Sequence, residues 1–381
     1  AQHDGRFEII IVSLASEIRN ELNVSITRPS SWKRGVQTAP GFWEGRTTTR
    51  IGAFAAEFEF QRYRPRHALT QVLSSCDLIQ VVCGAPAVAN AVHGLGKPVA
   101  IQVATRTKVE RAHLINAPSI RNYWQSTMTG IINVLDDRAL LKADAIQVEN
   151  PWMLDYVQQL NHTRNVDIRY APPGVDTTQF HPLQARDLRQ DPYILFVGRL
   201  DDPRKNPLRL LEAYAQLPKN TQNQCRLVLA GSSGPADAFW RRVDILGLTG
   251  RVNYIARPSP AELVALYQKA SVFALSSDEE GLGVVILEAM ACGIPVVATR
   301  CGGPDGIIDD GKNGYLVPLD DGKVMGHRLQ SLLTDHTLNL RMGQSAHNTI
   351  KQRYDERIAG EVFVDMWDRL LTQSKTTACA V

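Results

Sequence analysis

The sequence predicts an α/β protein made of two Rossmann-like, doubly wound domains. Short apolar runs that fit buried strands alternate with segments that fit helices along most of the 381 residues. This length is enough for two domains with separate cores. A loop-forming segment, PPGVDTTQFHP at 172–182, separates two such alternating series. We therefore predict domains over 1–180 and 181–354, a helix over 355–373 and a tail over 374–381.

Composition restricts the class of protein. With 44% hydrophobic and 21% charged residues, the chain fits an ordinary globular protein rather than a disordered one. The net charge of +3 is too small to indicate nucleic acid binding, although a local basic patch would suit an anionic substrate or a membrane surface. No apolar run approaches the ~18 residues that span a bilayer, and no signal peptide is recognised. The six cysteines lack metal-ligand spacing, which predicts reduced thiols in a cytoplasmic protein.

The first domain is predicted to begin with a strand at 7–12, FEIIIV. The stretch 28–49 is rich in Pro, Gly, Ser and Thr and fits a loop. A helical pattern over 54–73 follows, and Pro65 is expected to kink or break it. The remaining elements are strands at 76–84 and 96–105 and a helix, strand and helix over 135–155.

The second domain is predicted to open on a buried strand, YILFVGRL at 193–200. Gly198 allows a tight turn at the end of that strand, where Arg199 is presented. Lys205 follows six residues later, just before a helix over 207–216. A planar guanidinium and a flexible ammonium at one crevice suit a diphosphate, whereas either residue alone is typical of an ordinary surface charge. Further strands are predicted at 225–232 and 252–258, and further helices at 236–246, 260–270, 322–334, 338–354 and 356–371.

The stretch 271–318 predicts a strand, a loop, a helix, a second strand and a second loop. The apolar run 272–275 is short enough for a buried strand, and helical spacing follows a polar turn. Gly293 ends the helix, and the β-branched run 296–298 forms the next strand. A glycine loop at 302–303 lies at its carboxyl end. Because ligands of doubly wound sheets bind at the carboxyl ends of the strands, both loops are predicted to face one crevice.

Two glutamates stand at the ends of the first of these loops and its helix. Glu280 is expected just before the helix and Glu288 two turns inside it, roughly 12 Å further along at ~1.5 Å rise per residue. Between them, Gly281, Leu282 and Gly283 offer N–H groups at the positive end of the helix dipole, which suits a phosphate. Such a site suggests a ligand with hydroxyls at both ends and phosphate in the middle, the shape of a nucleotide sugar. The alternative is a Glu280 that complements the dipole and a Glu288 in an ordinary surface pair.

The segment EGLGVVILEAMACGIPVVATRCGG resembles the signature of the retaining glycosyltransferases of family 4. The form GRLxxxxKN around Arg199 and Lys205 likewise resembles the diphosphate-binding pair of that family. The resemblance implies the GT-B fold, in which two Rossmann-like domains face each other across a cleft and the final helix crosses back to the first domain. It implies catalytic roles for Glu280, Arg199 and Lys205. The implied donor contacts are Gly198, Arg199, Lys205, Ala256, Arg257, Glu280, Gly281, Leu282, Gly283, Val284 and Glu288.

The first domain departs from the family pattern. The family's first strand and glycine-rich loop have no match here, which implies either a fragment that lacks them or a remodelled domain. Ala104 stands where many members have a histidine near the donor sugar, and Glu149 with Asn150 replaces a small polar residue. His113 is a candidate for the crevice, but a lone loop histidine is more often structural or solvated.

The expected function is that of a retaining glycosyltransferase that moves a sugar from a nucleoside-diphosphate donor to a hydroxyl acceptor. Because the sequence holds no Asp-x-Asp motif, Arg199 and Lys205 are expected to hold the diphosphate without a metal, and no cofactor is predicted. The expected partners are the donor and an unknown acceptor, with no nucleic acid and no transmembrane segment; peripheral membrane contact is left open. One alternative is a non-catalytic or truncated nucleotide-sugar-binding protein. The other is a different GT-B enzyme such as a sugar-nucleotide epimerase, which would need carboxylate and histidine partners placed for proton abstraction.

Overall fold

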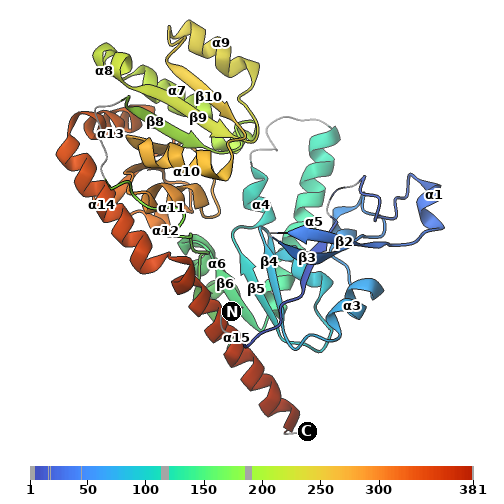
Figure 1. The fold of residues 1–381 in the computed structure, drawn as a ribbon. Coiled ribbons are helices and arrows are strands. Elements are labelled where there is room, and N and C mark those ends of the chain that lie inside the picture. The colour runs from blue at the N-terminus through green and yellow to red at the C-terminus, as the bar shows by residue number, and fades with distance from the viewer. Residues whose placement is uncertain are drawn as a thin grey trace. The chain divides into compact units, whose positions relative to one another are not determined.

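The computed structural model describes residues 5–15, 17, 19–43, 45–112, 120–184 and 191–379 (Figure 1). The chain divides into two compact units: unit 1 comprises residues 1–171 and 361–381, and unit 2 comprises residues 172–360. Residues 172–180, which the sequence placed in the first domain, therefore group with unit 2. The reason is a backbone link, because the N–H of Val175 donates to the carbonyl of Tyr354 at 2.8 Å and the N–H of Glu356 donates to the carbonyl of Val175 at 3.1 Å.

Unit 1 contains two sheets. The smaller has the strand order β1-β3-β2, with β1 parallel and β2 antiparallel to β3. The larger is parallel throughout, in the order β4-β5-β6-β7. The strands are β1 (Ile11–Leu14), β2 (Thr38–Trp43), β3 (Arg46–Ile51), β4 (Ile79–Cys83), β5 (Val99–Val103), β6 (Ala145–Val148) and β7 (Asp167–Tyr170).

The predicted elements of unit 1 need correction in places. The strand expected at 7–12 runs from Ile11 to Leu14 instead. The stretch 28–49 is not only loop, because it contains a short helix and the β2–β3 hairpin. Pro40 is tolerated in β2 because β2 is an edge strand, where the missing N–H need not pair. The helical pattern over 54–73 is broken at Pro65, as predicted, and gives two short helices, the first of which begins only at Glu59. The helices of unit 1 are α1 (Pro29–Trp32), α2 (Glu59–Arg62), α3 (His67–Leu73), the 3-10 helix η2 (Pro86–Ala91), α4 (Thr107–Glu110), α5 (Ile120–Lys142) and α6 (Pro151–Leu160).

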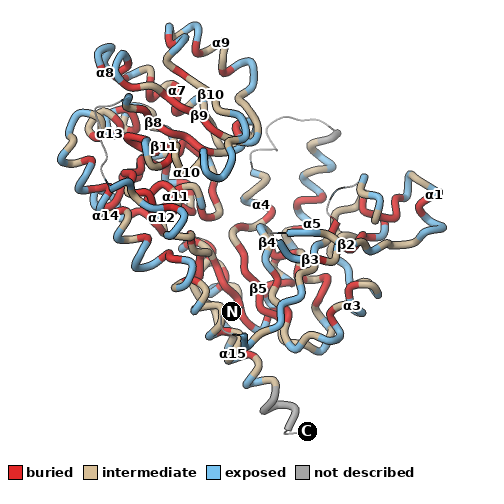
Figure 2. Tube along the Cα trace, in the orientation of Figure 1, coloured by how far each residue is buried: buried red, intermediate tan, exposed pale blue. Residues whose placement is uncertain are grey.

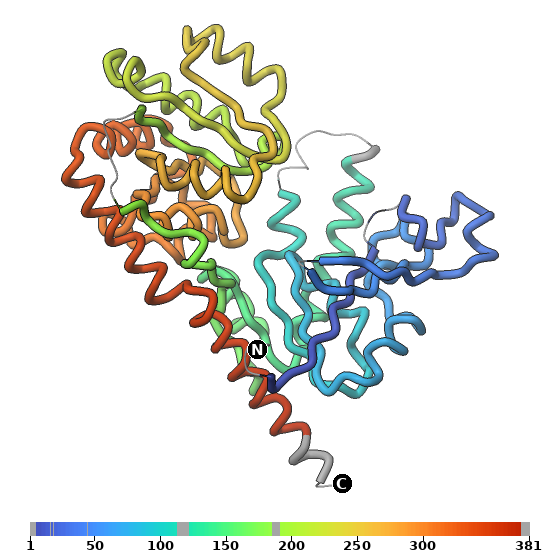
Figure 3. Tube along the Cα trace, in the orientation of Figure 1, coloured from blue at the N-terminus to red at the C-terminus, as the bar shows by residue number. Residues whose placement is uncertain are grey.

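The last helix, α15 (Glu356–Cys379), begins in unit 2 and continues in unit 1 (Figures 1 and 3). Met366 and Leu370 form a buried cluster with Ala100 and Ala145 of the parallel sheet. The indole N–H of Trp367 donates to Gln80 at 2.8 Å. The helix continues to Cys379, so the prediction that it ends at residue 373 and gives way to a tail over 374–381 is wrong for 374–379. No helix within the described ranges is long and apolar enough to cross a membrane.

Unit 2 is built on one parallel sheet of six strands in the order β10-β9-β8-β11-β12-β13. This is the order of the doubly wound Rossmann sheet, and the direction of winding reverses between β8 and β11. The strands are β8 (Tyr193–Val197), β9 (Arg226–Gly231), β10 (Val252–Ala256), β11 (Val272–Leu275), β12 (Val296–Thr299) and β13 (Gly314–Val317). The helices are η4 (Pro203–Lys205), α7 (Pro207–Ala215), α8 (Lys219–Gln224), α9 (Asp237–Ile245), α10 (Pro260–Lys269), α11 (Val284–Ala291), α12 (Pro304–Ile307), α13 (Gly322–Thr334) and α14 (His336–Arg353).

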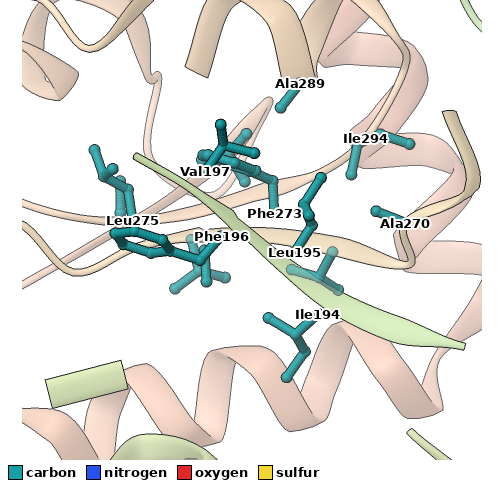
Figure 4. Close-up of a cluster of buried hydrophobic side chains, with 14 of the residues drawn as sticks. Ile194, Leu195, Phe196, Val197, Ala270, Phe273, Leu275, Ala289 and Ile294 are labelled. Carbon is teal, nitrogen blue, oxygen red and sulfur yellow. The ribbon is translucent and has the colours of Figure 1, made fainter. Parts of the chain in front are cut away.

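The core of unit 2 surrounds its two central strands. Every residue of β8 and of β11 is buried, because helices cover both faces of the sheet (Figure 2). Leu195 and Phe273 are paired in register on these neighbouring strands, and both are 0% exposed (Figure 4). This packing fixes the carboxyl ends of β8 and β11 side by side and so positions the loops that follow them.

Candidate functional site

The candidate site lies at the switch point, by which we mean the adjacent carboxyl ends of β8 and β11. The loop after β8 carries Gly198, Arg199 and Lys205, and the loop after β11 carries Glu280. The structure brings two of these together: the ammonium of Lys205 donates to both carboxylate oxygens of Glu280, each at 2.8 Å. A cation and a carboxylate from distant parts of the sequence therefore meet where a doubly wound sheet binds its ligand.

The Lys205–Glu280 ion pair is largely shielded from water. The side chains of Lys205 and Glu280 are 15% and 10% exposed. The hydroxyl of Ser277 also donates to Glu280, at 2.6 Å. A shielded pair of this kind is held in one geometry, and removal of one partner leaves an uncompensated charge. An incoming anion would share or take over Lys205.

Three successive acidic residues bind basic residues of the segment that follows β8. Besides the Lys205–Glu280 pair, Arg209 lies 2.6 Å from Asp278, and Arg204 lies 2.9 Å from Glu279. Ser276 strengthens this link, because its hydroxyl contacts the carbonyls of residues 205 and 206 at 3.1 and 2.9 Å. The sequence patterns give no role to Arg204 or Arg209, although the Asp-Glu-Glu run at 278–280 indicates basic partners. These contacts tie the two loops together before any ligand binds.

Arg199 stands apart from the Lys205–Glu280 ion pair. Its side chain is 61% exposed, and its guanidinium contacts Asp202 at 3.0 Å. Asp202 also binds Arg204 at 2.8 Å. Burial opposes the ionisation of Asp202, but hydrogen bonds from Arg204 outweigh it and hold the pKa of the carboxyl below its usual value. Arg199 is thus an exposed cation beside the crevice, with its guanidinium reachable by an anion.

The first loop contacts the glycine loop that follows β12. The N–H of Glu280 donates to the carbonyl of Cys301 at 3.2 Å, and the N–H of Gly303 donates to the carbonyl of Glu280 at 2.9 Å. A Cβ on Gly303 would lie 2.4 Å from the carbonyl oxygen of Leu282. Position 303 therefore requires glycine for the close approach of the two backbones.

Gly303→Ala is expected to destabilise unit 2 by about 1–3 kcal/mol, because the new methyl group must push one loop away from the other. The matched control is Gly322→Ala in α13, where an added Cβ meets nothing nearer than 3.9 Å. Urea unfolding of both variants checks the difference. Equal stability of the two variants would show that the loops separate without cost.

The helix α11 begins later than predicted. Its N-cap is Gly283, with φ at +84°, and its first residue is Val284. The first free N–H groups of the helix therefore come at Val284 and just after it rather than at 281–283. Leu282 is 4% exposed and belongs to the core, whereas Val284 is 46% exposed at the start of the helix. Any ligand contact from Leu282 would have to come from its backbone.

Glu288 lies only about one turn inside α11, because that helix starts at Val284 rather than near Gly281. The hydroxyl of Tyr267 donates to Glu288 at 2.6 Å. Burial raises the pKa of the Glu288 carboxyl, and the bond from Tyr267 partly opposes that rise. Glu288 is therefore not in an ordinary surface ion pair, which was the alternative left open by the sequence.

Ala256 and Arg257 lie at the carboxyl end of β10, two strands from β8 on the same edge of the sheet. Both are exposed. Arg257 has a left-handed backbone, with φ at +47°, and its N–H donates to the carbonyl of Gly231 at 2.8 Å. These residues share the edge of the sheet with the switch point but do not contact the Lys205–Glu280 ion pair.

In unit 1, the sequence-predicted positions lie at the carboxyl ends of β5 and β6. The side-chain amide of Asn150 donates to the carbonyl of Ala104 at 2.6 Å, and its oxygen caps α6 through the N–H of Met153. Asn150 thus has a structural role. Burial raises the pKa of Glu149 to about 7. His113 lies outside the described residues. Within the described ranges, no cluster of three or more His, Cys, Asp or Glu side chains could hold a metal ion.

Residues 183–349 match the family model for glycosyl transferases group 1. We call residues 183–349 the group 1 segment. The group 1 segment includes every predicted site residue of unit 2, from Gly198 to Glu288.

Two curated enzymes of the same name are similar to part of the chain. A D-inositol 3-phosphate glycosyltransferase from Corynebacterium jeikeium (strain K411) is 38% identical over 195 residues, which are 47% of this chain and 46% of the relative. An enzyme of the same name from Mycobacterium leprae (strain Br4923) is 36% identical over 207 residues, which are 50% of this chain and 46% of the relative. The chain therefore matches about half the length of these curated relatives.

Solved structures resemble a larger share of the chain than the curated relatives do. Sucrose-phosphate synthase from Thermosynechococcus elongatus has a TM-score of 0.69 at 19% identity, covering 92% of this chain and 88% of the other. HepE from Anabaena, solved in complex with UDP, has a TM-score of 0.65 at 18% identity, covering 84% and 86%. At this identity the likeness shows the fold alone. That fold is the GT-B fold, so the predicted fold class of two Rossmann-like domains is confirmed.

Proposed function

We propose that the chain is a retaining glycosyltransferase that moves a sugar from a nucleoside-diphosphate donor to a hydroxyl acceptor. The observation that carries the proposal is the Lys205–Glu280 ion pair at the switch point of a group 1 segment. A diphosphate needs cations, and a sugar needs a carboxylate that accepts hydroxyl hydrogens. The ion pair supplies both within 2.8 Å.

In this proposal the diphosphate lies between Arg199 and Lys205, near the first N–H groups of α11. Arg199 supplies a planar fork for two phosphate oxygens, and Lys205 neutralises the remaining charge as the leaving group departs. These groups take the place of a metal ion in the proposal. Glu288 binds the ribose hydroxyls, and Ala256 with Arg257 borders the base. The donor phosphates and sugar are bordered by Gly198 and by the backbone of Gly281, Leu282, Gly283 and Val284.

The transfer itself breaks the bond between the anomeric carbon and the phosphate oxygen and forms a bond to the acceptor oxygen on the same face. The acceptor's proton passes to the departing phosphate oxygen, so no protein base is required. Glu280 contacts the transferred sugar and stabilises positive charge near the anomeric carbon. Its charge matters most in the transition state, when that positive charge develops.

The names of the curated relatives suggest the first acceptor to test. These relatives are D-inositol 3-phosphate glycosyltransferases, and we use D-inositol 3-phosphate as the first hydroxyl acceptor. Since the match spans about half of each relative, the acceptor of this chain stays a proposal. The predicted placement in the cytoplasm also stays a proposal.

Incubation with UDP-, GDP- and ADP-sugars, with and without acceptor, tests the function. We expect nucleotide diphosphate to be released faster with acceptor present, and the product to keep the donor's anomeric configuration by NMR. Donor binding without release would favour a non-catalytic nucleotide-sugar-binding protein. Interconversion of donor sugars without transfer would favour an epimerase. An inverted product would contradict the retaining mechanism.

A further inference from the structure

A buried tyrosine holds one of the two glutamates of the site. Tyr267 lies near the end of α10 and is 0% exposed. Its hydroxyl donates to Oε2 of Glu288 at 2.6 Å, so the bond joins two helices that are separated in the sequence. The sequence patterns give Tyr267 no role beyond the core. The contact shows that its hydroxyl acts on a predicted ligand-binding carboxylate.

The ring of Tyr267 is held firmly by neighbouring aromatic rings. Its centroid lies 5.9 Å from that of Phe180, in an edge-on arrangement at 74°. The centroid of Phe273 in β11 lies 5.7 Å away. A buried phenol ring packed in this way has little freedom to turn, and its hydroxyl needs a partner to offset the loss of water. Tyr267 is therefore a fixed donor rather than a side chain that adapts to Glu288.

The environment of Glu288 makes that donor important. Burial disfavours the charged carboxylate and raises its pKa. The hydrogen bond from Tyr267 favours the charged form and lowers that pKa. A further titratable group near this pair is Cys292, the C-cap residue of α11, whose charge raises the pKa of Tyr267. No ion pair joins Glu288 to a basic side chain within the described ranges. Tyr267 thus supports both the orientation and the ionisation of Glu288.

We propose that Tyr267 is a positioning residue, which fixes the Glu288 carboxylate so that it can accept hydrogen bonds from the ribose hydroxyls of the donor. This inference rests on the proposed function. It adds that recognition of the ribose depends on a hydroxyl buried behind the carboxylate.

The variant Tyr267→Phe removes only that hydroxyl. The probes are UDP, GDP and ADP, of which the tightest binder is then compared with its 2′,3′-dideoxy form by calorimetry. The wild-type protein is expected to prefer the parent nucleotide by about tenfold or more, as for hydrogen bonds to a charged group. In Tyr267→Phe that preference is expected to fall about three- to tenfold, while affinity for the dideoxy nucleotide stays nearly unchanged.

The pH dependence of the preference separates positioning from a purely structural role. Loss of the Tyr267 hydroxyl removes an influence that lowers the pKa of Glu288, so its pKa rises further. A protonated Glu288 is a poorer acceptor. On acidification, the preference for the parent nucleotide is therefore expected to disappear at a higher pH in Tyr267→Phe than in the wild type. In a Glu288→Ala background, where position 288 holds no acceptor for Tyr267 or the ribose, Tyr267→Phe should change neither the preference nor its pH dependence.

Several outcomes would overturn the inference. Equal weakening of parent and dideoxy binding, or an additive penalty in the Glu288→Ala background, would leave Tyr267 a packing residue only. If Tyr267→Phe does not fold, Tyr267→3-fluorotyrosine replaces it, because this variant retains the ring and makes the hydroxyl a stronger donor. The pH at which half of the preference for the parent nucleotide is lost should then move down. An unchanged value of that pH contradicts positioning. Failure of the wild type to bind any of the three nucleotides contradicts the proposed function itself. Nucleotide binding with no ribose preference contradicts the Glu288 assignment.

Discussion

Lys205→Ala is expected to lower the free energy of unfolding of unit 2 by about 3–5 kcal/mol, because it leaves a shielded carboxylate without its cation. The side chain of Glu280 is 10% exposed, and Lys205 donates to both of its oxygens. Ser277 remains as a donor but supplies no charge. Thermal and urea unfolding measure the loss.

Arg199→Ala is the matched control for this prediction. Arg199 is 61% exposed in its pair with Asp202, so solvent screens the interaction and its loss should cost about 0–1 kcal/mol. The double variant Lys205→Ala/Glu280→Ala should be more stable than Lys205→Ala alone, since it removes the unpaired charge as well. A double variant less stable than Lys205→Ala would mean that the destabilisation comes from lost packing instead.

Glu280→Gln is expected to reduce kcat for sugar transfer by about 100-fold, the scale of one lost electrostatic contact to a developing charge. Glutamine keeps the size and the acceptor oxygen of Glu280 but not its charge. Because Glu280 and a diphosphate compete for Lys205, the variant should bind the free nucleotide diphosphate at least as tightly as the wild type. The expected signature is thus a loss in kcat without a loss in nucleotide affinity.

Steady-state kinetics and calorimetry together test this prediction, with Asp278→Asn as the control. Asp278 neighbours Glu280 and pairs with Arg209 rather than Lys205, and its side chain is 43% exposed. Its replacement should change kcat only slightly. Equal losses of affinity for the donor and for the free nucleotide in Glu280→Gln would contradict the assignment of Glu280 to the transferred sugar.

The sequence predicted unit 2 better than unit 1 for a physical reason. The strands β8 and β11 are covered on both faces, so they stand out as unbroken apolar runs between polar segments. The hairpin β2–β3 contains Pro40, Gly41 and three successive threonines, which resemble a loop. It forms because β2 pairs with β3 at the edge of the small sheet, a tertiary contact that composition does not reveal.

The residues of the site could be predicted, but their partners could not. The spacing of Glu280 and Glu288, together with the positions of Arg199 and Lys205 after a strand, pointed to one crevice. The contact between Lys205 and Glu280 joins residues 75 positions apart and depends on the geometry of two loops. The partner of Glu288 lies on a separate helix, where Tyr267 resembles any other core aromatic residue. Side-chain pairing of this kind follows from packing rather than from a local pattern.

The central claim is that Arg199 and Lys205 bind the diphosphate of the donor. Calorimetry with a nucleoside diphosphate and with the bare nucleoside, on wild type, Arg199→Ala, Lys205→Ala and the double variant, tests it most directly. We predict that the double variant loses most of its affinity for the diphosphate and keeps nearly all of its affinity for the nucleoside. It should also lose less than the sum of the single variants, because two cations that serve one anion are coupled. Arg199→Lys should not restore binding, since the planar fork is lost. Equal weakening for both ligands would contradict the claim and would place the two residues in support of the fold or the base pocket.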